Sequence, residues 1–141
     1  MQREESSIYI SLLDLRNKLY SAQFLMTKAD RMIYGDRLMT ESADTLKNFI
    51  LAFDIPQKRY EYLLECMAHF NVLRIDLDFI TQKNIIHYKL GAKKDQEGNP
   101  VEKKDRINSQ QVDLFRTIAK IEEDIHKWWN SINKGKHVVG I

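Results

Sequence analysis

The sequence predicts an all-α protein with the architecture of an up-down-up-down four-helix bundle. Apolar residues recur at steps of three and four over long stretches, which is the period of an amphipathic helix. Only five glycines and two prolines interrupt 141 residues. All but one of the connections between the periodic stretches are short, as between antiparallel neighbours in a bundle. With 43% hydrophobic residues, we expect one domain over residues 1–141 with a substantial core.

The first helix is expected to follow a serine cap at Ser6 or Ser7 and to end near Thr27. Its inward stripe is predicted to be Ile8, Leu12, Leu15, Leu19, Ala22 and Met26, widened by Leu13, Tyr20 and Phe24.

A weak boundary over residues 28–35 precedes the second helix, which is expected to run from Arg31 or Asp36 to Phe53. Ile55 closes this helix, because a residue that precedes proline disfavours the α region. The residues predicted to face inward are Met39, Ala43, Leu46, Ile50 and Phe53.

The third helix is the longest periodic stretch and is predicted over residues 56–83. Pro56 occupies the first helical position, where the missing N–H would have had no partner. A helix of this length needs neighbours along most of its surface. Its predicted inward stripe is Tyr60, Leu63, Leu64, Met67, Phe70, Leu73, Leu77 and Ile80.

Residues 84–108 are the one shift in composition and are predicted to be an irregular insertion, either a long connection or a small hairpin with its turn at residues 97–100. Ile85, Ile86, Tyr88 and Leu90 fit a strand or the end of a helix. The last helix is expected to begin near Asn108 or Ser109 and to stop at Gly135. Its predicted inward residues are Val112, Phe115, Ile118, Ile121, Ile125, Trp128 and Ile132.

The positive charge lies in the second part of the chain. Residues 1–80 carry 10 basic and 12 acidic side chains, whereas residues 81–141 carry 12 basic and 8 acidic ones, so the total is only +2. A patch that faces phosphates and a solvated loop with lysines at a helix C-terminus both explain this distribution. Charge alone favours the solvated loop. The lysines of the insertion in question are Lys93, Lys94, Lys103 and Lys104.

Patterns typical of catalysis are incomplete. Glu123 and His126 supply one Glu-x-x-His pair, whereas a di-iron bundle needs two such pairs. Cys66 has no evident activating base and is interpreted as an inert thiol. We therefore expect a non-enzyme without a metal or a cofactor. The N-terminus lacks an apolar leader and no window reaches about 18 apolar residues, which predicts a cytoplasmic protein with no membrane partner.

Trp128 and Trp129 are adjacent and therefore point about 100° apart on a helix. Trp128 continues the inward stripe and is assigned to the core. Trp129 is interpreted either as an anchor at a partner interface, where tryptophan is enriched, or as a residue half-buried against the insertion.

Three segments, over residues 31–52, 71–86 and 121–136, together resemble a known family. Their order and apolar spacing, with the ending WWNSINKGK, are similar to the accessory variability determinant (Avd) of diversity-generating retroelements. Avd proteins belong to a wider group of four-helix bundles that includes proteins encoded in ribosomal RNA intervening sequences. The resemblance implies a non-catalytic homopentamer that binds reverse transcriptase and template RNA and supports mutagenic complementary-DNA synthesis.

The resemblance also implies contact residues. Arg74 matches a basic position of the family's Leu-Arg pattern and Arg37 matches a polar or basic position after a loop glycine, so both, with Lys134, are expected to contact polymerase or RNA. The family tends to have a second basic residue one turn after Arg74, whereas this chain has Asp78 there. Asp78 could instead form an ion pair with Arg74.

The connection over residues 87–108 is longer than in the family, and the family's proline in the first inter-helix loop is absent. We hypothesise that the lysines of the insertion replace the missing helix charge. Two alternatives stay open: an intervening-sequence-type bundle with an unrelated RNA or protein partner, and a metal-dependent bundle enzyme.

Overall fold

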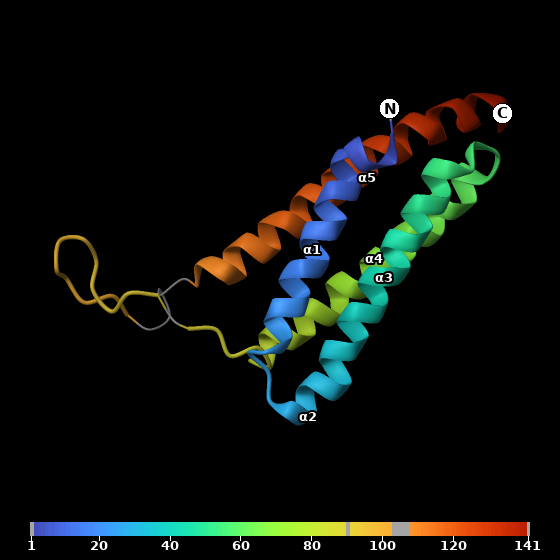
Figure 1. The fold of residues 1–141 in the computed structure, drawn as a ribbon. Coiled ribbons are helices and arrows are strands. Elements are labelled where there is room, and N and C mark those ends of the chain that lie inside the picture. The colour runs from blue at the N-terminus through green and yellow to red at the C-terminus, as the bar shows by residue number, and fades with distance from the viewer. Residues whose placement is uncertain (1, 90, 103–107, 141) are drawn as a thin grey trace.

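The computed structural model describes residues 2–89, 91–102 and 108–140, with residues 133–140 as backbone alone. Four long helices lie alongside one another (Figure 1): α1 (Ser7–Gln23), α3 (Asp36–Asp54), α4 (Arg59–Gln82) and α5 (Ser109–Gly140). Three short helical turns, η1 (Arg3–Glu5), η2 (Arg31–Gly35) and η3 (Pro56–Lys58), and the short helix α2 (Lys28–Asp30) complete the described elements. The predicted all-helical class and its four long helices are confirmed.

The four helices enclose one core. α1 lies against α3 and α5, and α4 lies against the same two helices, so α1 and α4 occupy opposite corners of the bundle. Each helix contributes side chains with almost no exposed surface, among them Leu15, Phe49, Leu73 and Ile121. Burying this apolar surface is what holds the helices together.

α1 ends earlier than predicted, at Gln23 rather than near Thr27. The chain turns there, and the Thr27 hydroxyl then accepts a hydrogen bond from the Asp30 N–H at 3.2 Å, which caps α2. Residues 28–35, predicted to be a boundary, are helical and lead through the π-helical turn η2 directly into α3. Gly35 lies close to α1 in this turn, and a Cβ atom there would lie 3.0 Å from the Gln23 Cγ, so that side chain would have to shift.

Two predicted stripes are wrong in part. On α1, Leu13, Tyr20 and Phe24 are exposed and do not widen the core face. On α3 the buried face is one residue out of phase with the prediction, and the residues predicted to face inward are only half-buried. Ser42 and Thr45 can be buried because their hydroxyls donate to the carbonyls of Met39 and Glu41. The buried residues of α3 are Leu38, Ser42, Thr45, Phe49 and Ala52.

Pro56 begins the turn η3 as predicted, and regular α-helix follows from Arg59. The Arg59 guanidinium donates to the carbonyls of Ala52 and Phe53 at 2.9 and 3.1 Å, and so satisfies the C-terminal end of α3. In the predicted inward stripe of α4, Leu64 is 43% exposed, whereas Cys66 is fully buried.

α4 ends at Gln82, and Asn84 then adopts a positive φ of 54°. This left-handed residue redirects the chain, so that Ile85 and Ile86 enter the core and the His87 N–H donates to the Leu25 carbonyl at 2.8 Å. The segment thus neither prolongs the helix nor forms a strand through Tyr88.

α5 begins at Ser109 as predicted, and the Asn108 side chain accepts from the Gln111 N–H at 3.0 Å. The predicted stop at Gly135 is wrong, because the helix continues to Gly140. A glycine inside a helix costs only about 1 kcal/mol relative to alanine and does not prevent its continuation. Val112 is exposed, and Leu114 is buried in its place.

The phase of α3 can be tested by two neighbouring alanine substitutions. Phe49→Ala should lower the free energy of unfolding by about 3–5 kcal/mol, because it leaves a cavity against Phe53 and Trp128. Ile50→Ala should cost about 1 kcal/mol, because Ile50 is only half-buried. Urea unfolding measures both, and an equal loss for the two variants would contradict the observed phase.

Candidate nucleic-acid interface

Residues 91–102 form a small hairpin that projects away from the bundle (Figure 1). Lys94 and Pro100 form an antiparallel bridge, and the Val101 N–H donates to the Lys93 carbonyl at 2.8 Å. At the tip, an Asp95 carboxylate oxygen accepts from the backbone N–H of Asn99 at 2.9 Å. Of the two predicted forms of the insertion, the small hairpin is the one present.

The glycine of this turn has a structural reason. Gly98 adopts a φ of 86°, in the left-handed region that other residues rarely occupy. The Asp95 carboxylate also accepts from the Glu97 N–H at 2.9 Å, so one side chain organises the whole tip. The hairpin therefore presents the adjacent lysines from a defined turn.

Lys93 and Lys94 lie in the hairpin and are exposed. Neither forms an ion pair within the described part of the chain. The hairpin holds both cations outside the bundle, where a phosphate can approach them from several sides. Lys103 and Lys104, predicted to belong to the same patch, lie outside the described residues.

Arg37, a predicted contact residue, is already engaged in an ion pair. Its guanidinium donates to both carboxylate oxygens of Asp76 on α4 at 2.9 and 2.8 Å, and lies 3.7 Å from Glu41. These acidic neighbours raise the pKa of Arg37 above its ordinary value, the hydrogen bond to Asp76 being the largest cause. A phosphate would have to compete with two carboxylates for this cation.

Arg74 is engaged in the same way, on another side of α4. Its guanidinium donates to Glu122 of α5 at 2.9 Å, so it pairs across helices and not with Asp78. Arg37 lies at the contact of α3 with α4, and Arg74 at the contact of α4 with α5. The structure therefore does not bring the two predicted arginines together.

The two remaining predicted contact residues belong to α5. Trp129 is half-buried, with its ring 4.9 Å from the ring of Tyr60 on α4, so it lies against a helix rather than against the insertion. Trp128 packs edge-on to Phe49 at 5.5 Å and lies under the Arg59 guanidinium. Lys134 is on the same helix, and its side chain lies outside the described residues.

A half-buried acidic pair adjoins Arg37 and has no signal in the sequence. Glu41 of α3 and Asp76 of α4 both adjoin Arg37, and burial, followed by the interaction with Asp76, raises the pKa of Glu41 to about 8. One carboxylate oxygen of Glu41 is buried without a hydrogen-bond partner among the described residues. Burial raises the pKa of Asp76, but Glu41 and Arg37 outweigh it and lower that pKa.

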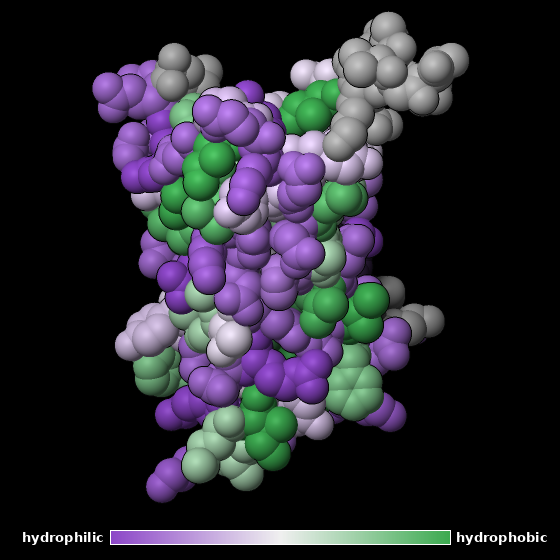
Figure 2. Space-filling model, turned by 90° about the vertical axis from the view of Figure 1, so that its right-hand side faces the viewer, coloured by the Kyte–Doolittle hydropathy of each residue, from purple (hydrophilic) through white to green (hydrophobic). Residues whose placement is uncertain are grey.

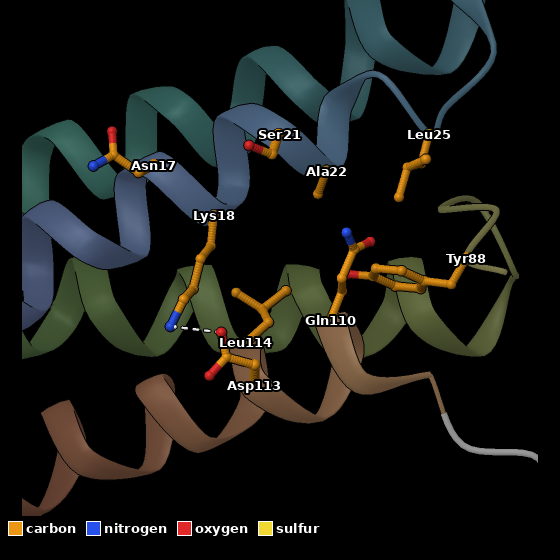
Figure 3. Close-up of a pocket in the computed structure, with 9 residues that line it drawn as sticks. All are labelled: Asn17, Lys18, Ser21, Ala22, Leu25, Tyr88, Gln110, Asp113 and Leu114. Carbon is orange, nitrogen blue, oxygen red and sulfur yellow. Dashed lines mark ion pairs between the residues drawn. The ribbon is translucent and has the colours of Figure 1, made fainter. Parts of the chain in front are cut away.

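A cavity of about 310 Å³ lies between α1, Tyr88 and the start of α5 (Figure 3). Ala22, Leu25 and Leu114 line its apolar part. At one end Lys18 is held by Asp113 at 2.9 Å, by Asp14 at 2.7 Å and by the Thr117 hydroxyl at 2.6 Å. With its one ammonium group already bound to two carboxylates, the cavity offers no free cation for an anionic ligand.

Two kinds of feature are absent from the described residues. No group of three or more histidine, cysteine, aspartate or glutamate side chains is placed there to hold a metal ion. None of the described helices has the length and apolar character required to cross a membrane. Seen from the side of α3 and α4, the apolar groups on the surface lie between polar ones (Figure 2).

Comparison of the chain with protein-family models, with curated proteins and with solved structures finds no match.

The acidic pair gives a test of how the bundle responds to pH. Glu41 binds its proton more tightly in the folded chain, with a pKa of about 8 against 4.5. Its contribution to stability is therefore complete below about pH 4.5 and is lost as the pH rises through about 8. Glu41→Gln should remove this loss and raise the melting temperature at pH 8.5 relative to wild type.

Thermal unfolding followed by circular dichroism between pH 5 and 8.5 measures the effect. The matched control is Asp36→Asn, at an exposed position on the same helix and outside the charges that raise the pKa of Glu41, which should leave the pH dependence in place. A wild-type stability that does not fall over this range, or an equal slope for Glu41→Gln, would contradict the assignment.

Proposed function

We propose that the chain is a non-catalytic accessory subunit of the Avd type. In this proposal it is a cytoplasmic homo-oligomer, by resemblance a pentamer, that binds reverse transcriptase and template RNA and so supports mutagenic complementary-DNA synthesis. It needs neither a metal nor a cofactor for this role. The observation that carries its RNA-binding part is the projecting hairpin, whose two lysines are exposed and form no ion pair with any residue that the structure describes.

The arrangement of the three family-like segments supports the proposal. Residues 31–52 and 71–86 are joined by the ion pair of Arg37 with Asp76. Residues 71–86 and 121–136 are joined by the ion pair of Arg74 with Glu122. The three segments that carry the resemblance thus pack together around α4, as expected if they form one structural unit.

We further propose that the bundle has the up-down-up-down topology. Side-chain pairs support it, because residue numbers rise on one helix as they fall on its neighbour. α1 and α5 are linked by Ser7 with Asp124 and by Lys18 with Asp113. α3 and α4 are linked by Arg37 with Asp76 and, at the turn, by Arg59 with Phe53.

RNA contact is assigned to the hairpin in this proposal, and not to the two arginines. A cation that already pairs with a carboxylate releases few counterions when phosphate approaches it, whereas exposed lysines release theirs. Lys93 and Lys94 are exposed lysines of the insertion that form no ion pair among the described residues. Trp129 and Lys134 remain the proposed contacts to the polymerase on α5.

The ion pairs of Arg37 and Arg74 favour a second candidate function. If both positions serve the fold, then the chain is an intervening-sequence-type bundle whose RNA or protein partner is unrelated to retroelements. Co-purification with the reverse transcriptase encoded nearest to its gene separates the two candidates. A stable complex favours the Avd type, and its absence favours the second.

The hairpin lysines can be tested by charge reversal. Lys93→Glu with Lys94→Glu should weaken RNA binding more than tenfold at low salt and reduce the slope of log K against log[salt] by about 2, one for each lost contact. Fluorescence anisotropy with a labelled single-stranded RNA, titrated at several salt concentrations, measures both quantities.

The control reverses two lysines elsewhere, Lys47 and Lys58, which are exposed and belong to α3 and η3. It changes the net charge by the same amount and should leave affinity within twofold of wild type. Equal losses in both double variants would mean that RNA senses only the total charge, and no binding by wild type would end the RNA assignment.

The native mass tests the proposed assembly. Light scattering after size exclusion should give about five times the mass of one chain at low and moderate salt, because an apolar interface is little affected by screening. A monomer at micromolar concentration would contradict the proposed homo-oligomer.

A further inference from the structure

Two stripes of exposed side chains run along opposite corners of the bundle. The α1 outer stripe consists of Ile10, Leu13, Asn17, Tyr20 and Phe24, all of them exposed. The α4 outer stripe consists of Leu64, Ala68, Val72, Ile75 and Phe79, all of them exposed. Tyr20 and Phe24 are each 57% exposed and Ile75 is 67% exposed, so the internal core leaves much of these side chains uncovered.

The spacing of both stripes is that of helix-to-helix packing. The α1 outer stripe advances by steps of three and four in strict alternation, and residues 68–79 of α4 advance by four, three and four. This heptad spacing is the narrow seam by which one helix packs against another. Single exposed apolar residues are ordinary on a protein surface, but two rows of them at heptad spacing are not.

Both stripes point away from the core. At about 100° per residue, the α1 outer stripe lies on the opposite side of its helix from Leu12, Leu15 and Leu19, which are fully buried. The α4 outer stripe is likewise opposite to Leu73 and Leu77. Because α1 and α4 are at opposite corners of the bundle, the two stripes face in opposite directions and cannot meet within one chain.

We infer that the α1 outer stripe of one copy packs against the α4 outer stripe of a second copy. This inference rests on the homo-oligomer of the proposed function and names the surfaces that form it. Such a contact is heterologous, since each copy uses a different surface toward each neighbour. Repeated with a rotation that closes, it gives a ring.

Acidic and basic side chains near the ends of the two stripes favour one direction for the contact. Glu4 and Glu5 are exposed before the start of α1, and the Arg31 guanidinium lies over the Phe24 ring at its other end. On α4, Glu61 and Glu65 are exposed near the start, and the Lys83 ammonium lies near Phe79 at the end. Antiparallel packing places opposite charges together at both ends, whereas parallel packing places like charges together.

Side-chain size agrees with the antiparallel direction. Tyr20 and Phe24, the two aromatic residues of the α1 outer stripe, then face the part of α4 that carries Ala68 and Leu64. The small side chain of Ala68 leaves room for an aromatic ring from the partner. Asn17, the one polar member of its stripe, is of the type that fixes register in a helical seam.

Two substitutions and their mixture test the inference. Tyr20→Glu blocks the α1 outer stripe and Ile75→Glu blocks the α4 outer stripe, and both residues are exposed, so the helical circular dichroism should be unchanged. Each variant alone should be monomeric by light scattering. Mixed in equal amounts they should form a dimer, because the mixture contains one intact stripe of each kind that can still pair.

Several outcomes would overturn the inference. If Tyr20→Glu alone remained dimeric, then two copies of α4 would pair with each other and the contact would be isologous. If both variants kept the wild-type mass, then the interface would lie elsewhere while the proposed homo-oligomer would stand. If wild type were monomeric, then the homo-oligomer and this inference would both fail. The RNA-binding part of the proposed function would not be affected, because its own experiment tests it. Thr40→Glu, at an exposed site on α3, is the control and should keep the wild-type mass.

The direction of packing has its own test. Glu61→Lys with Glu65→Lys should weaken association at low salt, and Lys28→Glu in the same chain, at an exposed position just beyond the same end of α1, should restore it by returning opposite charges to that end. Sedimentation velocity over a range of concentrations measures the change. Failure of the third substitution to restore association would overturn the antiparallel arrangement.

Discussion

The rest of the structure depends on the burial of one apolar face from each of four helices in a shared core. Leu15, Phe49, Leu73 and Ile121 meet there with almost no exposed surface, one from each long helix. A helix that gives one face to this core keeps its opposite face for water or for a partner. The ion pairs, the projecting hairpin and the two outer stripes all lie on surfaces that the core leaves free.

Apolar period and helix-capping residues predicted most of the fold. The sequence predicts the four long helices, the helix start at Pro56 and the cap at Asn108, because each of these features depends on residues that are close along the chain. The sequence does not predict which face of α3 is buried. Ser42 and Thr45 lie on that face because their hydroxyls form hydrogen bonds to backbone carbonyls, which a hydropathy pattern does not take into account. The continuation of α5 through Gly135 was missed because a glycine weakens a helix without ending it.

The candidate site was less predictable than the fold, because its contacts join distant parts of the chain. Arg37 and Arg74 look available in the sequence, yet Asp76 and Glu122 neutralise them across helix contacts. The raised pKa of Glu41 likewise depends on Asp76, which lies on the next helix. The hairpin lysines are exposed, and the Asp95 carboxylate beside them accepts hydrogen bonds from the backbone of the turn.

The two outer stripes are easily mistaken for core when a single helix is considered alone. Leu13, Tyr20 and Phe24 were assigned to the core face of α1, since apolar residues on both sides of a helix blur its period. A helix that is apolar on two opposite faces needs two partners. Within one bundle only one of those faces is covered, and we infer that a second copy of the chain, with its matching face and complementary end charges, covers the other.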